Sequence, residues 1–96
     1  MGRKKRLVLH LHSKWFFLIK EGIKKEEYRA HTLYWMRRLM LHDYDEVEFC
    51  QGYPKQGDKG RRLVFRNPHV SIGQGRSEWG AETGVVYYKI KWDDAG

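Results

Sequence analysis

The hydrophobic pattern changes from alternation to helical spacing near the start of the chain, and this change constrains the fold most. Leucine occupies every second position in Arg6–His12, which predicts a strand with one apolar face. The apolar residues of Trp15–Ile19 then recur at helical spacing. Ser13 is suited to the N-cap of this helix, and Gly22 to the position just after its end. We therefore expect a strand followed directly by a helix that packs on its sheet.

After Gly22 the periodicity predicts one more helix and otherwise only strands. Thr32 is suited to cap a helix over residues 33–41, with an inward side made of the residues at helical spacing, Leu33, Met36, Leu39 and Met40. Strands are expected at residues 25–29, 45–50, 61–65, 70–72 and 85–92. The strand over 61–65 should stop near Asn67–Pro68, because proline cannot donate to a sheet ladder. This order predicts a small α+β fold with a curled or closed sheet and two helices in the N-terminal half.

Length and composition limit the class of protein. A chain of 96 residues with 41% hydrophobic content suits one domain with one core, so we treat residues 1–96 as a single domain with residues 1–5 as a basic tail. A single cysteine, Cys50, excludes an internal disulfide and a cysteine-based zinc cluster, and it favours a reducing, cytoplasmic setting. No apolar run approaches the length of a membrane span, so we expect no membrane partner. The pattern indicates no particular oligomeric state.

The positive charge of the chain lies mainly in its first third. The net charge is +7, and residues 1–30 hold nine Lys or Arg against three Asp or Glu. This excess favours a phosphate-bearing partner. For the tail alone, a role in solubility is the simpler interpretation.

The segment Gly22–Arg29 concentrates charge directly after the apolar run Trp15–Ile19. Its charged residues are Lys24, Lys25, Glu26, Glu27 and Arg29. Because the preceding run must be buried, these charges begin at the edge of the core, where they need partners. Charged groups held in such places often form functional sites. The structural alternative is a set of ion pairs, Lys24 with Glu27 and Glu27 with Arg29.

The spacing Gly22-x-Lys24-x-x-Glu27-x-Arg29 matches the GxKxxExR signature of the ASCH domain, a branch of the PUA-like superfamily. Gly52-Tyr53-Pro54 and the Trp79-Gly80 segment before the last strand also resemble short ASCH proteins of bacteria and phages. The resemblance extends from about residue 6 to residue 92. It implies a PUA-like β-barrel of about five to six strands flanked by helices. It also implies a cleft with the Lys, Glu and Arg of the motif on its floor, and binding of RNA or nucleotides.

Our first hypothesis is therefore a module that binds RNA or a nucleotide. Lys24 and Arg29 would neutralise phosphate or base oxygens, and Glu27 would accept hydrogen bonds from a base amino group. Trp35 and Tyr53 are the first candidates for stacking on an unpaired base, and cations would line the rim. The residues expected to contact nucleic acid are Lys24, Lys25, Glu27, Arg29, Trp35, Arg38, Tyr53 and Lys55.

The first alternative is a small hydrolase that acts on RNA or a modified nucleoside, with Lys24 and Glu27 as its acid–base pair. One ASCH branch removes acyl groups from N4-acylated cytidine with a Lys, a Thr and a distal Glu. The Lys matches Lys24, but the Thr position holds Glu27, so the resemblance does not support a threonine nucleophile. A second alternative is an adaptor that uses the fold for protein contacts.

We expect neither a metal nor a cofactor. His10 and His12 share one face of a strand, but the spacing supplies no third ligand. Gly73-Gln-Gly75 lacks the Lys-Ser/Thr ending of a phosphate loop and does not open a helix. Cys50 suits the core or edge of a strand better than the role of a nucleophile.

Overall fold

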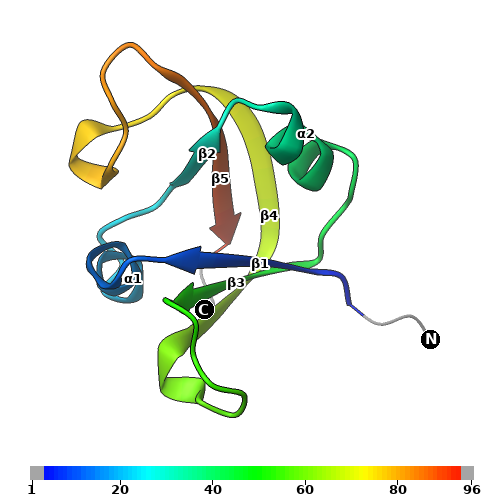
Figure 1. Cartoon of the computed structure of the whole chain (residues 1–96), viewed down its shortest axis with the longest axis vertical. Coiled ribbons are helices and arrows are strands. Elements are labelled where there is room, and N and C mark those ends of the chain that lie inside the picture. Colours follow the sequence, from blue (N-terminus) through cyan, green and yellow to red (C-terminus); the bar gives the residue numbers. More distant parts are fainter. Residues whose placement is uncertain (1–3, 94–96) are drawn as a thin grey trace.

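The computed structural model describes residues 4–93 (Figure 1). The elements in chain order are β1 (Arg6–Leu11), α1 (Ser13–Lys20), β2 (Glu27–Ala30), α2 (Leu33–Met40), β3 (Glu46–Gln51), β4 (Arg62–Gln74) and β5 (Val86–Asp93). Single 3-10 turns at Lys59–Arg61 and Ser77–Trp79 lie in the loops on either side of β4. The α+β class and the two N-terminal-half helices are confirmed. No helix within these residues is long and apolar enough to cross a membrane.

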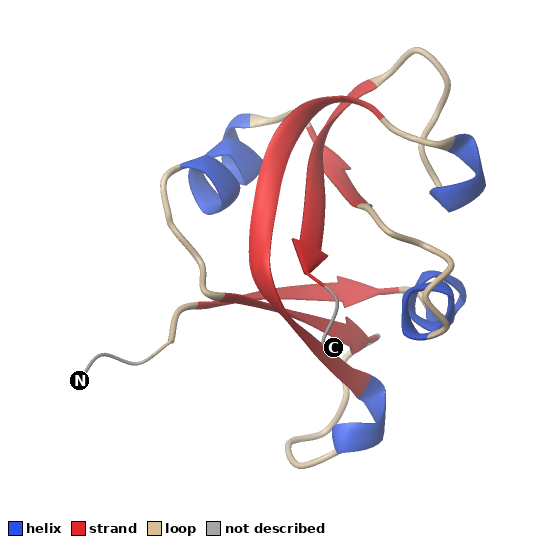
Figure 2. Cartoon of the chain, turned by 180° about the vertical axis from the view of Figure 1, so that it is seen from behind, coloured by secondary structure: helices blue, strands red, loops and turns tan. Residues whose placement is uncertain are grey.

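The strands form one curled sheet with the order β1-β3-β4-β5-β2. β1 runs parallel to β3, and the other neighbours are antiparallel. β4 is long and bends between the two ends of the sheet (Figure 2). β1 and β2 lie at the two ends of the strand order, so they are the edge strands of the sheet. The sheet is therefore open in the part of the chain that the structure describes.

The prediction that a strand stops near Asn67–Pro68 is wrong, because β4 continues through these residues. The pairing of β4 with β5 shifts its register between Arg66 and His69, as in a β-bulge. Asn67 adopts a left-handed φ of 51° within this bulge. Its main-chain N–H donates to the Asp45 carbonyl at 2.9 Å, and its side-chain Nδ2 donates to Asp93 at 2.9 Å. The residues of the bulge therefore bend β4 without ending it. The sequence pattern indicates two separate strands at this place.

We expect Asn67→Ala to lower the free energy of unfolding by about 1–2 kcal/mol, because alanine pays the full steric cost of a left-handed backbone. Asn67→Gly is the matched control: it tolerates this φ and loses only the exposed hydrogen bond to Asp93. Urea denaturation of both variants measures the difference. Equal destabilisation by the two substitutions would contradict a role for backbone strain.

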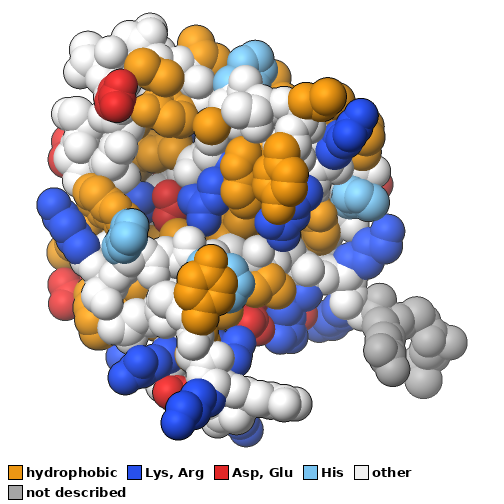
Figure 3. Space-filling model, in the orientation of Figure 1, with side chains coloured by type: hydrophobic (Ala, Val, Ile, Leu, Met, Phe, Trp, Pro, Cys, Tyr) orange, Lys and Arg blue, Asp and Glu red, His pale blue; other side chains and the backbone are white. Residues whose placement is uncertain are grey.

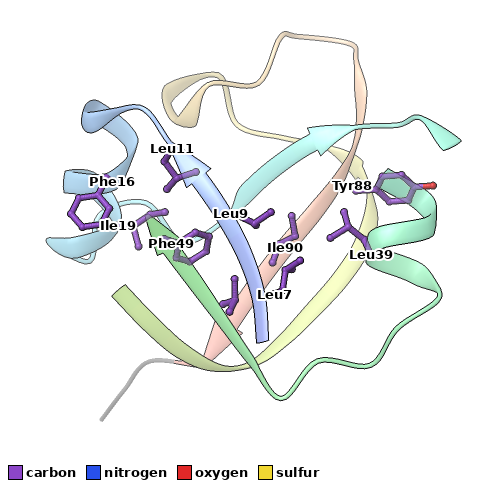
Figure 4. Close-up of a cluster of buried hydrophobic side chains, with 10 residues drawn as sticks. Leu7, Leu9, Leu11, Phe16, Ile19, Leu39, Phe49, Tyr88 and Ile90 are labelled. Atoms are coloured by element: carbon purple, nitrogen blue, oxygen red, sulfur yellow. The ribbon is translucent and has the colours of Figure 1, made fainter. Parts of the chain in front are cut away.

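The core lies on the inner side of the curled sheet (Figure 4). The alternation in the first strand is confirmed, since its three leucines are buried while Arg6 and His10 are exposed. α1 adds Phe16 and Ile19 to the same core. The buried core residues are Leu7, Leu9, Leu11, Phe16, Ile19, Leu39, Val47, Phe49, Tyr88 and Ile90.

Of the residues predicted to begin or end the two helices, Thr32 and Gly22 are confirmed and Ser13 is not. Thr32 caps α2 by accepting a hydrogen bond from the Trp35 N–H, and Gly22 follows α1 with a φ of 76°, as expected. The N-cap of α1 is His12 and not Ser13. The hydroxyl of Ser13 instead accepts a hydrogen bond from Gln51.

The inward side of α2 is narrower than predicted. Leu39 is buried and Met36 packs against the core, but Leu33 is 58% exposed and Met40 is 46% exposed. α2 is short, and it leaves much of its surface without a partner. The helical spacing correctly located the helix but overestimated how much of it the core covers.

Of the predicted basic tail, residues 1–3 lie outside the described residues. Lys5 already belongs to the folded structure. Its N–H donates to the Asp45 carboxylate at 2.8 Å, and its carbonyl accepts from the Asp45 and Glu46 N–H groups. The start of β1 is thereby tied to the start of β3.

Candidate functional site

A cavity of about 510 Å³ lies where the two edges of the sheet face each other. Main-chain and side-chain atoms of β1 form one wall, and β2 with α2 forms another. The loop after β4 contributes Trp79 and Gly80. Figure 3 shows this face as a hollow in which acidic and basic side chains lie between hydrophobic ones. The volume falls within the range of pockets that hold small ligands.

Lys24 is buried in this site, with 1% of its surface exposed. Its Nζ donates to Glu27 Oε1 at 3.2 Å and to the Trp79 carbonyl at 2.7 Å. The ammonium also lies 4.5 Å from the centre of the Trp15 ring, a cation–π contact. Burial lowers the pKa of Lys24, although the Coulomb attraction of Glu27 acts in the opposite direction. A buried lysine in this arrangement is a fixed charge beside apolar walls.

Glu27 is 5% exposed and lies between two cations. Its Oε1 accepts from Lys24, from the Tyr28 N–H at 2.9 Å, and pairs with Arg29 Nη1 at 3.4 Å. Its Oε2 is buried and has no hydrogen-bond partner among residues 4–93. A buried carboxylate oxygen without a donor is costly, so each such atom calls for an explanation. Oε2 is thus an unpaired acceptor on a residue of the cavity lining, and neighbouring atoms cover it.

Two arginines connect the opposing walls and enclose Trp35. Arg29 donates to the Tyr28 carbonyl at 2.8 Å and to the His10 carbonyl at 3.2 Å, so it bridges β2 and β1. Arg38 donates to the Val8 carbonyl at 3.3 Å. The two guanidinium carbons lie 5.2 and 5.0 Å from the centre of the Trp35 ring. Burial lowers the pKa of Arg29, and the Coulomb attraction of Glu27 offsets part of this effect. Arg29 and Arg38 thus donate to main-chain carbonyl groups of the edge strand β1, with which a further strand could otherwise pair.

The loop after β4 approaches the other walls through glycines. A Cβ on Gly80 would lie 3.0 Å from the Trp15 ring, and a Cβ on Gly75 would lie 2.6 Å from the Tyr28 ring. Only glycine permits this closeness, which places the Trp79 carbonyl within reach of Lys24. This glycine-rich loop therefore forms a wall of the cavity.

A hydrogen-bonded network fixes Tyr28 behind that wall. The Tyr28 hydroxyl donates to Glu26 at 2.7 Å and accepts from the Arg76 N–H at 2.9 Å. Burial, assisted by the Glu26 hydrogen bond, raises the pKa of Tyr28 to about 12. The pKa of Glu26 is lowered, because hydrogen bonds from Tyr28 and Lys91 outweigh the opposing effect of burial. The neutral phenol thus anchors the loop to β2.

Tyr53 stands at the mouth of the cavity and is 86% exposed. Its ring stacks on His10, with the ring centres 4.2 Å apart and an angle of 20° between the planes. His10 Nδ1 is 2.8 Å from the Gly52 carbonyl oxygen, to which it is hydrogen-bonded. The stack therefore holds an exposed aromatic ring in a defined orientation.

The cavity gathers most of the residues expected to contact nucleic acid. Those that line it are Lys24, Glu27, Arg29, Trp35, Arg38 and Tyr53. Lys25 and Lys55 are exposed and are not part of the lining. Sequence reasoning assigned Trp15 to the core and gave no site role to Trp79, although both line the cavity. A tryptophan within a glycine-rich polar loop was the available signal for Trp79.

Cys50, the one candidate thiol, is not part of the cavity lining. Cys50 is fully buried and donates to Glu48 at 3.3 Å. Burial, with the Glu48 hydrogen bond, raises the pKa of the Cys50 thiol to about 11, which suppresses the reactive thiolate. Among the residues described, no group of three or more His, Cys, Asp or Glu could hold a metal ion.

No family model, curated protein or solved structure matches this chain. The functional argument therefore depends on the geometry of the cavity. That geometry offers one unpaired buried acceptor, three cationic side chains and several aromatic rings within a single pocket. This combination suits a planar ligand that carries both N–H donors and negative charge.

Proposed function

We propose that the cavity binds one unpaired nucleotide of an RNA, and that the chain is an ASCH-like module of the PUA-like type. On this proposal the open curled sheet corresponds to the family's barrel, with the cavity at the join between β1 and β2. A reducing cytoplasmic setting belongs to the same proposal, which the single free cysteine supports. The convergence of Lys24, Glu27 and Arg29 on one cavity supports the family assignment.

The unpaired Oε2 of Glu27 is the observation that carries the proposal. Oε2 is covered, so a ligand would reach it only after a local movement of side chains. Because a carboxylate oxygen accepts hydrogen bonds only, that ligand would need an N–H or O–H donor at that place. The exocyclic amino groups of nucleobases are such donors. Lys24 beside it would donate to a ring nitrogen or carbonyl oxygen, because its ammonium carries three N–H groups. An acceptor next to a donor matches the mixed edge of a base.

The surrounding side chains suit the rest of a nucleotide. Trp35, Tyr34 and Trp79 line the cavity and offer ring faces or edges for a base, and base–aromatic stacking is sequence-tolerant. Arg29 and Arg38 each carry five N–H donors, and their main-chain bonds leave others for a phosphate. Stacking and charge would hold the nucleotide. The hydrogen bond to Glu27 would distinguish bases that offer an amino group at that place from bases that do not.

A hydrolase is the second candidate, favoured by the lowered pKa of Lys24 and its 3.2 Å contact with Glu27. Burial makes the Lys24 ammonium a better proton donor than an exposed lysine, and Glu27 is placed to exchange a proton with it, as a general acid–base pair requires. The pair would act on RNA or on a modified nucleoside bound in the same cavity. Turnover, and not binding, separates this function from the first.

The experiment is a fluorescence anisotropy titration of the protein and its Glu27→Gln variant with labelled single-stranded RNA, duplex RNA and DNA. The glutamine side chain keeps one oxygen for the Tyr28 N–H but replaces the free acceptor with a donor. We expect about 10- to 100-fold weaker binding of single-stranded RNA, the loss of one charged hydrogen bond. Glu21→Gln, at an exposed carboxylate on the end of α1, is the matched control and should bind normally.

Equal affinity of wild type and Glu27→Gln for every nucleic acid would overturn the proposal. Chromatography of the same mixtures decides between the candidates. A new product that forms with wild type and not with Glu27→Gln would identify a hydrolase. Binding without product identifies a binding module, and the absence of both would leave the adaptor hypothesis.

A further inference from the structure

We propose that the ligand is a single strand of RNA longer than one nucleotide, and that it runs from the cavity over Tyr53 to a second, basic cavity on the outer face of the sheet. This inference rests on the proposed function, because it takes one nucleotide in the first cavity as given. It adds a second base-stacking position and a site for the phosphates that follow.

The outer face of β1 connects the two cavities. Its leucines point into the core, so its other side chains lie outside, and Arg6 is exposed at one end while His10 is exposed at the other. Val8 and His10 line the first cavity, and Arg6 lines the second. Arg6 and His10 are four residues apart, or about 13 Å along a strand. The two cavities therefore lie next to each other along one strand.

The second cavity has a volume of about 500 Å³ and carries a surplus of positive charge. Arg6, Lys59 and Arg62 line it together with one carboxylate, Glu48. Glu48 is buried and accepts from Arg6 at 2.9 Å and from Arg62 at 3.1 Å. Arg6 also donates to Glu46 from Nε at 3.2 Å and from Nη2 at 3.0 Å. These contacts orient both guanidinium groups and leave the remaining N–H donors of each for a phosphate. Lys59 is exposed and forms no ion pair within residues 4–93.

Tyr53 lies on the loop that joins the two cavities. Arg62 anchors this loop by donating from Nη2 to the Pro54 carbonyl at 3.3 Å and to the Lys55 carbonyl at 3.1 Å. The stack on His10 leaves the other face of the Tyr53 ring open, as its 86% exposure indicates. An aromatic ring already held in place loses little freedom when a base stacks on it. Tyr53 is thus a stacking position for the nucleotide next to the one in the cavity.

The test compares RNA ligands from a single nucleoside monophosphate to about eight nucleotides, a length chosen to exceed the smallest sites of single-strand-binding domains. Affinity should increase with length up to about four nucleotides and then level off. Tyr53→Ala should weaken binding of the longer strands about tenfold more than it weakens binding of a mononucleotide. Tyr53→Phe keeps the ring and should bind every length as wild type does. Because Tyr53 is exposed, neither variant threatens the fold.

Lys59→Ala tests the phosphate contact in the second cavity. For the longest strand, we expect the slope of log affinity against log salt to become shallower by about 0.7, the contribution of one phosphate contact on a single strand. Lys20→Ala removes an exposed lysine at the end of α1 that lines neither cavity, and it should leave the slope unchanged. Titrations between about 50 and 200 mM salt give both slopes.

The outcomes separate this inference from the function on which it rests. If mononucleotides bind in a Glu27-dependent way and longer strands bind no better, the second position does not exist, although the proposed function stands. If Tyr53→Ala and Tyr53→Phe weaken binding equally, stacking on this ring is excluded. If no ligand of any length binds in a Glu27-dependent way, the proposed function itself fails. Length-dependent binding lost in Tyr53→Ala alone supports the inference.

Discussion

Glu27→Ala should lower the free energy of unfolding by about 3–5 kcal/mol, the cost of leaving a buried charge without its partner. Glu27 accepts hydrogen bonds from Lys24 and Tyr28 and pairs with Arg29. Lys24 is 1% exposed, so water cannot replace the lost carboxylate without a local rearrangement. Urea denaturation followed by tryptophan fluorescence measures the change.

The control variants separate loss of the pair from loss of one partner. Lys24→Met should cost less than Glu27→Ala, because Glu27 keeps Arg29 and the Tyr28 N–H as partners. The double variant Lys24→Met/Glu27→Gln leaves no buried ammonium and keeps an acceptor for Tyr28, so it should recover most of the lost stability. It should not recover RNA binding. A double variant less stable than Glu27→Ala would contradict this account of the pair.

The destabilisation by Glu27→Ala should also depend on pH. Burial already lowers the pKa of Lys24, and removing Glu27 removes an interaction that raises it. A folded-state pKa below the unfolded value means that the folded protein gains relative stability as pH rises through that lowered pKa. The difference in unfolding free energy between Glu27→Ala and wild type should therefore shrink as the pH rises toward about 10.4, the pKa of an exposed lysine. A constant difference over this range would show that Lys24 does not carry the effect.

Phe16→Ala should lower the free energy of unfolding by about 3–5 kcal/mol, because it removes a large side chain from a close-packed core. Phe16 is fully buried beside Ile19 on α1 and belongs to the single core cluster. For a domain of this size, the lower limit corresponds to a fall in melting temperature of about 12 °C or more. Thermal denaturation followed by circular dichroism measures it.

Phe17→Ala is the matched control, with the same substitution one position along the same helix. Phe17 is 44% exposed, and its ring contacts Phe16 only edge to face at 5.5 Å between centres. We expect it to cost less than about 1.5 kcal/mol, part of the value of a fully buried aromatic side chain. Similar losses for the two variants would mean that the helix face toward the core has been assigned wrongly.

Most of the secondary structure could be predicted from local pattern. The alternating leucines of β1, the cap at Thr32 and the glycine after α1 are local signals, and each element appears where it was expected. The two strands predicted on either side of Asn67–Pro68 are one strand, because the bulge is stabilised by contacts to Asp45 and Asp93 from distant parts of the chain. Local propensity carries no information about such partners.

The site was predictable in its chemistry but not in its full extent. The charges after a buried run indicated that Lys24, Glu27 and Arg29 need partners, and both cations do pair with Glu27. Trp79 approaches Lys24 only because the loop after β4 returns across the cavity, where Gly75 and Gly80 lie close to the opposite walls. A contact between residues 55 positions apart has no signature in sequence spacing.

The sequence by itself determined the α+β class, the order of the elements, the apolar face of β1 and the charged residues that require burial with partners. These properties depend on neighbours along the chain, because periodicity and capping act over one or two turns. Only the tertiary structure decided that the sheet stays open, with β1 joined to β2 by Arg29 and to α2 by Arg38, and that Glu27 keeps one buried oxygen unpaired among residues 4–93. Both follow from how β4 bends the sheet and brings β2 opposite β1, a long-range arrangement that packing of the whole core selects.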